Sequence, residues 1–185
     1  MATSTPPLPE TVYGVFSDQI NLATTYRIFQ NIAGASQKGV AHVHLLFQSN
    51  GGFVADGICL YNAFRALPLG LTLYNAGSVQ SIGAIAYLGA KCRKASTYSS
   101  FMIHRTTFSP QFATGAQLKS LVEAAGIDDA RVEAILRNHL KLPDDLWKEL
   151  YHRDLVFSAQ DAVKYGLADE VAEFTPPTGA TIYNI

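Results

Sequence analysis

The sequence has few cysteines and little net charge, and both shortages argue against particular classes of protein. Cys59 and Cys92 are its only cysteines, and they are isolated and fit no metal-ligand spacing. A disulfide framework or a zinc site is therefore not expected, and both thiols should be free and buried or half-buried. The formal net charge of -1 does not provide the basic field that nucleic acid or anionic lipid would attract.

Long apolar runs are also missing. No run reaches the roughly 18 residues that a membrane-spanning helix requires, and the first ten residues lack the regions of a signal peptide. We therefore expect a cytoplasmic protein that binds neither membrane nor nucleic acid. Apolar residues make up 48% of the 185 residues, which suits one domain with a full core. The expected parts are an extended arm over 1–10, a single domain over 11–174 and a tail over 175–185.

Strand and helix patterns alternate in the first half of the domain. This order predicts an α/β fold with a largely parallel sheet. The predicted strands cover 11–16, 41–49 and 71–77, the predicted helices cover 22–34 and 55–67, and a strand-rich stretch covers 94–105.

The second half is mostly helical. The pattern over residues 114–140 predicts one long helix, or two abutting helices if Gly126 and Asp128 mark a break. A short helix is expected over 143–150. Another is expected over 158–166, with Ser158 as the N-cap and Gly166 as the C-terminal stop. A last strand is predicted over 168–174.

Ser81 is the best-placed candidate nucleophile. It follows the strand 71–77 and begins the apolar segment SIGAIAYLGA, where the unpaired N–H groups of a helix start favour developing negative charge. Gly83 fits the pattern of a nucleophile elbow, but Val79 stands where that pattern has its first glycine. The alternative is an ordinary helix N-cap. Ser78 offers an equally available hydroxyl.

Paired glycines follow the strand 41–49 in the stretch QSNGGF. This is the edge at which open α/β sheets place their sites. Gly51 and Gly52 would let backbone N–H groups approach a substrate without a Cβ in the way. A tight turn with no further role is the alternative.

His104 is the candidate general base, because it ends an apolar strand and its side chain titrates near neutrality. A structural histidine is the alternative. Asp154 stands just before an apolar triplet and a helix cap, where a carboxylate could orient the imidazole; pairing with Arg153 or a surface position is the alternative. His139 and His152 have more polar neighbours and are expected at the surface.

His42 and His44 share one strand face and could form a metal pair. No nearby acidic residue or cysteine completes a ligand set. A metal site is therefore not predicted.

Four stretches together resemble, in order, the signature blocks of the proteolytic subunit of the Clp protease. They are QSNGGF, GSVQSIGA, SSFMIHR and HRDLVFSAQDAVKYGLADEV, and the resemblance spans about 45–171. It implies a Clp/crotonase-like fold of repeated strand-helix units with a protruding long helix. It also implies a serine endopeptidase that forms an acyl-enzyme, with Ser81 as nucleophile, His104 as base and Asp154 as the orienting carboxylate.

The same resemblance implies the rest of the site and the partners. The oxyanion hole would be the backbone N–H groups of Gly52 and Ile82, and no metal or organic cofactor would be needed. The substrate would be a peptide or an unfolded protein. The chain would form a ring-like homo-oligomer in which the long helix joins rings, and an ATPase unfoldase is a candidate partner.

The chain also departs from the family's blocks. Asn50 replaces a proline, Ile82 replaces a methionine, and Val79 and Gln80 replace small residues. After His104, RTTFSPQFATG stands where the family has Gln-Pro and a glycine-rich strand. Two other functions therefore stay open: a non-catalytic subunit of a Clp-like assembly whose triad is not aligned, and a crotonase-like acyl-CoA enzyme.

Overall fold

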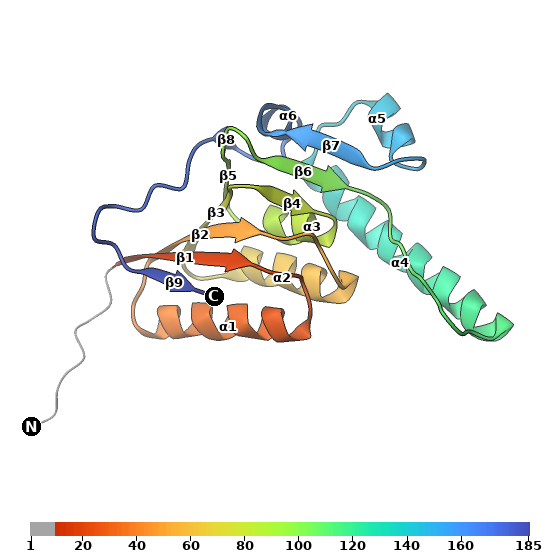
Figure 1. The fold of residues 1–185 in the computed structure, drawn as a ribbon, viewed down its shortest axis with the longest axis horizontal. Coiled ribbons are helices and arrows are strands. Elements are labelled where there is room, and N and C mark those ends of the chain that lie inside the picture. The colour runs from red at the N-terminus through yellow and green to blue at the C-terminus, as the bar shows by residue number, and fades with distance from the viewer. Residues whose placement is uncertain (1–9) are drawn as a thin grey trace, which may run out of the picture.

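The computed structural model describes residues 10–185, so all of the predicted N-terminal arm except Glu10 lies outside the described residues. These residues form layers of helices packed on a large parallel sheet (Figure 1). The prediction of an α/β fold with a largely parallel sheet is confirmed.

The large sheet has six strands in the order β8-β5-β3-β2-β1-β9, and every neighbouring pair is parallel. Every second residue of β1 and β2 is buried, because only one face of these strands packs on the helices. The six strands are β1 (Thr11–Ser17), β2 (His42–Gln48), β3 (Gly70–Asn75), β5 (Cys92–Ala95), β8 (Glu170–Val171) and β9 (Ile182–Asn184).

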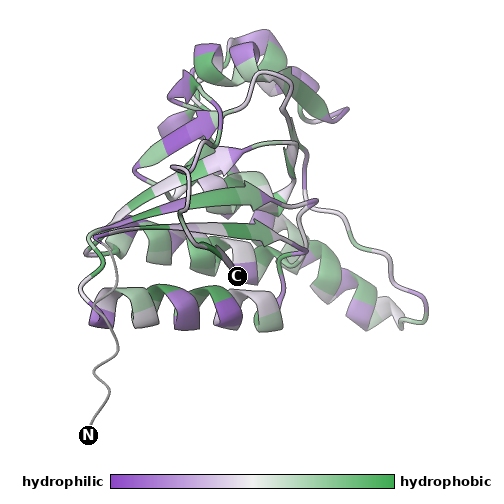
Figure 2. Ribbon diagram, turned by 60° about the vertical axis from the view of Figure 1, so that its left-hand side comes forward, coloured by the Kyte–Doolittle hydropathy of each residue, from purple (hydrophilic) through white to green (hydrophobic). Residues whose placement is uncertain are grey.

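Three helices lie on the buried side of the large sheet (Figure 1). They are α1 (Leu22–Gln37), α2 (Val54–Ala66) and α3 (Ile82–Leu88). A capping box between Asn21 and Thr24 fixes the start of α1. Hydrophobic and hydrophilic residues alternate along α1 (Figure 2), as expected of a helix with one face on the core and one in solvent.

A second, three-stranded sheet lies beside the first, in the order β4-β6-β7. Its strands are β4 (Ser78–Gln80), β6 (Ser100–Ile103) and β7 (Leu155–Ser158). β4 and β6 are parallel, and β6 and β7 are antiparallel. A bridge between Ser49 and Val79 joins the two sheets. The stretch 94–105, predicted to be strand-rich, contains the end of β5 and all of β6, and a turn closed by the Ser99 N–H and the Ser96 carbonyl separates the two strands.

The C-terminal half contains α4 (Gly115–His139), α5 (Asp144–Glu149) and α6 (Ala159–Tyr165). α4 runs through Gly126 without a break, since a single glycine in a long helix costs only about 1 kcal/mol relative to alanine. It extends beyond the sheets (Figure 1). Ser158 caps α6 and Gly166 ends it in the left-handed conformation, as predicted.

Other local predictions need correction. The predicted strand over 168–174 is only β8, and part of the predicted tail adds β9 to the sheet edge, where it pairs with β1. Cys92 is half-buried but Cys59 is exposed on α2, and both are free thiols. Within residues 10–185, no helix is both long and apolar enough to cross a membrane.

Candidate active site

Ser81 lies at the sharp turn between β4 and α3. Its φ of 55° and ψ of -132° make it the one non-glycine residue between residues 10 and 185 with a positive φ. Two hydrogen bonds hold this turn: the Ser81 N–H donates to the Met102 carbonyl at 2.8 Å, and the Gln80 N–H donates to the Ser49 carbonyl at 2.8 Å. Non-glycine residues kept in such a conformation are concentrated at functional sites.

The Ser81 hydroxyl is not used to cap α3, although Ser81 occupies the N-cap position. Instead, its Oγ lies 2.7 Å from the Nε2 atom of His104. In the tautomer that is protonated at Nδ1, the hydroxyl donates to Nε2, which is the arrangement that a general base requires. The structure therefore brings together the two residues that the sequence proposed as nucleophile and base.

Gly51 and Gly52 form the wall opposite the turn, and both have positive φ values, 97° and 152°. A Cβ at Gly51 would stand 2.6 Å from the Ser81 Cβ, and a Cβ at Gly52 would collide with the Ile20 backbone. Gly51 is therefore required for the chain to pass this close to Ser81, and Gly52 is required for it to pass this close to the Ile20 backbone. The alternative of a turn with no further role does not account for this close approach.

Gly52 and Ile82 accompany Ser81 and His104 among the residues that line one cleft. Within the described part of the chain, neither the Gly52 N–H nor the Ile82 N–H has a hydrogen-bond acceptor. Ile82 is the first residue of α3, so its N–H has no partner within the helix. Both groups are free to donate to a ligand.

Asp154 lies in register with His104, but its carboxylate is not bonded to it. β6 and β7 pair Ile103 with Leu155, which places Asp154 opposite His104 at the end of the ladder. The residue is exposed, and the bonds of residues 10–185 include none between its carboxylate and the imidazole. Arg153 pairs with Glu149 and not with the Asp154 carboxylate. Of the two alternatives for Asp154, the structure has the surface position.

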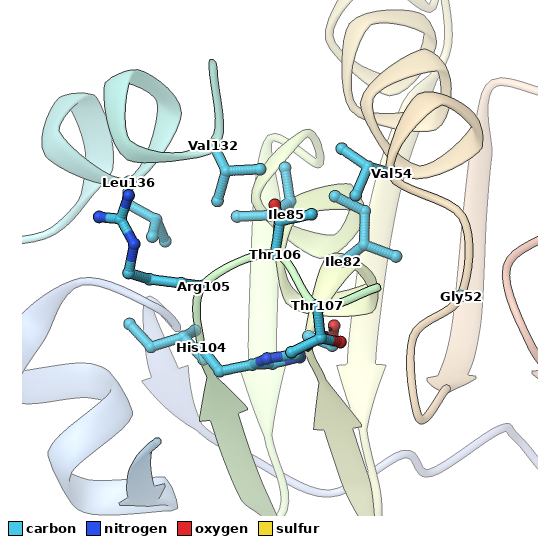
Figure 3. Close-up of a pocket in the computed structure, with 12 residues that line it drawn as sticks. Gly52, Val54, Ile82, Ile85, His104, Arg105, Thr106, Thr107, Val132 and Leu136 are labelled. Atoms are coloured by element: carbon cyan, nitrogen blue, oxygen red, sulfur yellow. Dashed lines mark hydrogen bonds between the residues drawn. The ribbon is translucent and has the colours of Figure 1, made fainter. Parts of the chain in front are cut away.

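The cleft beside Ser81 has about 450 Å³ of empty space, part of it open to solvent. In Figure 3, apolar side chains of α2, α3 and α4 surround it on the side away from His104. These are Val54, Ile82, Ile85, Val132 and Leu136. The sequence analysis did not predict that α4 contributes Val132 and Leu136 to this cleft.

The remaining candidates lie apart from this cleft. Ser78 is bonded to Gln80 and Ser100. His44 is bonded to Tyr74 at 2.9 Å, and burial, together with His42 and Lys94, lowers the pKa of its imidazole. Over residues 10–185, no three potential metal ligands cluster.

His139 and His152, both expected at the surface, differ from each other. His152 is exposed, whereas His139 is half-buried and bonded to Tyr61 at 3.0 Å. The prediction for His139 was therefore wrong, since the end of α4 packs against α2.

Comparison with known proteins gives one family. The model of the Clp protease family matches residues 12–175. ATP-dependent Clp protease proteolytic subunit 1 of Gloeobacter violaceus is 27% identical over 139 residues, which cover 72% of this chain and 68% of that protein. The corresponding subunit 1 of Chlamydia felis is 28% identical over 140 residues, with 74% and 68% covered.

A further relative and one solved structure agree. The ATP-dependent Clp protease proteolytic subunit of Deinococcus radiodurans is 25% identical over 142 residues, with 76% of this chain and 69% of that protein covered. A mutant of ClpP1 from Listeria monocytogenes has the same fold, with a TM-score of 0.76, 17% identity, and coverage of 88% of this chain and 91% of that one. Because the family match includes all four sequence blocks and the turn at Ser81, the resemblance seen in those blocks is confirmed, and the chain belongs to the Clp protease family of peptidases.

Proposed function

We propose that the protein is a serine endopeptidase that cleaves peptide bonds through an acyl-enzyme. One observation carries this proposal: the Ser81 hydroxyl lies 2.7 Å from His104 Nε2. Ser81 has a strained backbone conformation, and its hydroxyl does not cap α3. A hydroxyl becomes a competent nucleophile when an adjacent base takes its proton.

The reaction follows from this geometry. Ser81 Oγ attacks the carbonyl carbon while His104 Nε2 takes the hydroxyl proton. The same proton then goes to the leaving amine as the C–N bond breaks, which leaves an ester on Ser81. Water, deprotonated by Nε2, attacks the ester, and the proton returns to Ser81 as the acid product leaves. No step requires a metal or an organic cofactor.

The oxyanion would be held by the N–H groups of Gly52 and Ile82. Both N–H groups are without acceptors among residues 10–185, and the two residues line the cleft together with Ser81. Donors fixed in advance at the developing charge stabilise the transition state without reorganisation, and loss of one typically costs about 100-fold to 1,000-fold in rate.

Asp154 is proposed as the residue that orients His104. Its place opposite His104 in the β6–β7 ladder supports this role. A carboxylate on Nδ1 holds the tautomer in which Nε2 can accept a proton. In free enzymes such bonds are often long and tighten only in the reactive complex.

The substrate is proposed to be a peptide or an unfolded protein with an apolar side chain next to the cleaved bond, since apolar groups line the cleft beyond Ser81. We also propose a ring-like homo-oligomer. The apolar side chains exposed on and before α4 support it, Phe112 and Val122 among them. An ATPase partner is proposed because the relatives' names describe them as ATP-dependent.

The direct kinetic test is Ser81→Ala, assayed on a short fluorogenic peptide. Loss of the nucleophile should lower kcat by several powers of ten while the unfolding temperature stays the same, since an oxyanion hole alone retains little rate. Unchanged kcat would remove Ser81 from the mechanism.

A second candidate is a non-catalytic subunit of a Clp-like assembly. The observation that favours it is the exposed Asp154 carboxylate, which makes no bond with His104. The two candidates differ for Asp154→Asn: in an active enzyme kcat should fall about 10,000-fold by analogy with other triads. In a non-catalytic subunit neither the parent protein nor the variant would cleave the peptide.

A further inference from the structure

The chain has no regular secondary structure between His104 and α4, that is, over residues 104–114. β6 fixes the backbone before His104, because Ile103 pairs with Leu155. The backbone after His104 has no such ladder. A base at a strand end needs some other constraint on its far side if its ring is to stay in place.

Asp129 of α4 provides contacts at this point. Its Oδ1 accepts a hydrogen bond from the Thr106 N–H at 2.7 Å, and its Oδ2 accepts one from Arg105 Nη2 at 2.6 Å. The Asp129 side chain is only 14% exposed, which reduces screening by water. One carboxylate therefore ties the two residues that follow His104 to the long helix.

Arg105 also contacts Tyr151, in the segment that carries Asp154. Its guanidinium lies over the Tyr151 ring, 4.5 Å from the ring centre. The Tyr151 hydroxyl in turn donates to Glu133 Oε2 at 3.1 Å, one turn of α4 after Asp129. In Figure 3 the Arg105 side chain turns toward α4 while the His104 ring points the other way.

We infer that Asp129 is a positioning residue, which fixes the backbone after His104 and so keeps the imidazole against Ser81. This inference rests on the proposed function. Asp129 itself is not among the residues that line the cleft. Arg105 ends the matching block SSFMIHR, and Thr106 lies in the stretch after it, where the chain departs from the family.

The test compares Asp129→Ala with Asp128→Ala in the full-length protein. Asp128 is the matched control, because it pairs with Arg131 on the same helix and makes no bond to residues 104–106. A misplaced base should slow the chemistry and leave peptide binding unchanged. For Asp129→Ala we expect kcat to fall about 10-fold to 100-fold, with KM as in the parent protein. Loss of the two hydrogen bonds should also lower the unfolding temperature, so kcat is measured where the variant is fully folded. Asp128→Ala should keep the parent kcat.

Two conservative variants separate positioning from loss of fold. Asp129→Asn keeps an oxygen that can accept from the Thr106 N–H, so it should recover part of the lost kcat. Arg105→Gln removes the guanidinium but leaves the bond between the Thr106 N–H and Asp129. Its kcat should therefore lie between those of the parent protein and Asp129→Ala. If Asp129→Ala unfolds, these two variants decide the question.

A readout without catalysis is hydrogen exchange of the Thr106 amide. Release from the Asp129 carboxylate should make this amide exchange at least about ten times faster in Asp129→Ala, and Asp128→Ala should leave it as in the parent. Parent kcat and parent exchange in Asp129→Ala would overturn the inference. If the parent protein and Ser81→Ala are equally inactive, the proposed serine mechanism fails, and exchange alone then decides whether Asp129 holds the segment.

Discussion

The residue on which the account depends most is Ser81. Its φ of 55° is a conformation that costs a non-glycine residue on the order of 1–3 kcal/mol, so the surrounding structure must impose it. The hydrogen bond from Ser81 to Met102 and the bridge between Ser49 and Val79 do so. Strain of this kind points the hydroxyl out of the turn and toward His104.

Gly51→Ala should lower kcat about 100-fold or more, because the added Cβ would stand 2.6 Å from the Ser81 Cβ and displace the nucleophile. The matched control is Gly34→Ala on α1, where a Cβ meets nothing within 4 Å. Steady-state kinetics on a short peptide would measure both. A Gly51→Ala enzyme with the parent kcat would show that the turn tolerates displacement.

Single residues also show where prediction from sequence ends. Ser81 and His104 could be proposed because each stands in a recognisable block, and the structure places them 2.7 Å apart. The contact between Arg105 and Asp129 could not be predicted, since it spans 24 positions and depends on how α4 is rotated about its axis. The exposed position of the Asp154 carboxylate depends on a side-chain torsion that no pattern encodes.

Among the elements, the end of α4 shows how a helix is tied to its neighbours. His139 Nε2 and the Tyr61 hydroxyl lie 3.0 Å apart, and Arg93 is 3.4 Å from the other ring nitrogen. Burial lowers the pKa of the His139 imidazole, the charges of Arg93 and Arg65 lower it further, and Asp169 opposes them. The folded structure therefore disfavours the charged form of the His139 imidazole.

The free energy of unfolding should depend on pH through His139. Because the pKa of His139 lies below its ordinary value of 6.5 in the folded protein, the unfolded chain takes up the proton first as pH falls. The free energy of unfolding should then decrease as pH drops below about 6.5. His139→Gln should show a shallower decrease in denaturant titrations between pH 7 and 5. The exposed His152→Gln serves as control, and equal slopes in parent and His139→Gln would contradict the prediction.

Element length explains which parts of the fold could be predicted. The long elements β1, β2, α1, α2 and α4 were found within a few residues, because hydrophobic periodicity accumulates over their length. β4, β7 and β9 were missed. They have only three or four residues each, and they exist as strands because distant partners pair with them.

In the molecule as a whole, α4 extends beyond the sheets (Figure 1), and apolar side chains along it are exposed to solvent. Phe112, just before the helix, is 98% exposed, and Val122 is 60% exposed. Clustered exposed apolar groups of this kind are typical of surfaces that pack against another chain. In the proposed homo-oligomer, a second copy of this chain would cover these side chains.

Charge on this surface should break the assembly. Val122→Asp should give particles of lower mass in sedimentation velocity, because burial of a carboxylate without a partner is costly. Ser36→Asp, on the exposed side of α1, should assemble like the parent protein. If the parent protein sediments as a single chain, the homo-oligomer proposal is wrong.

Fluorophosphonate labelling of the purified protein would show whether Ser81 is an activated nucleophile. The adduct would be mapped by mass spectrometry, with Ser81→Ala as control and the mass of the assembly checked in the same sample. We predict one adduct, on Ser81, that is absent from Ser81→Ala. An intact oligomer that takes up no label at Ser81 would show that Ser81 is not activated and make the non-catalytic subunit the better description.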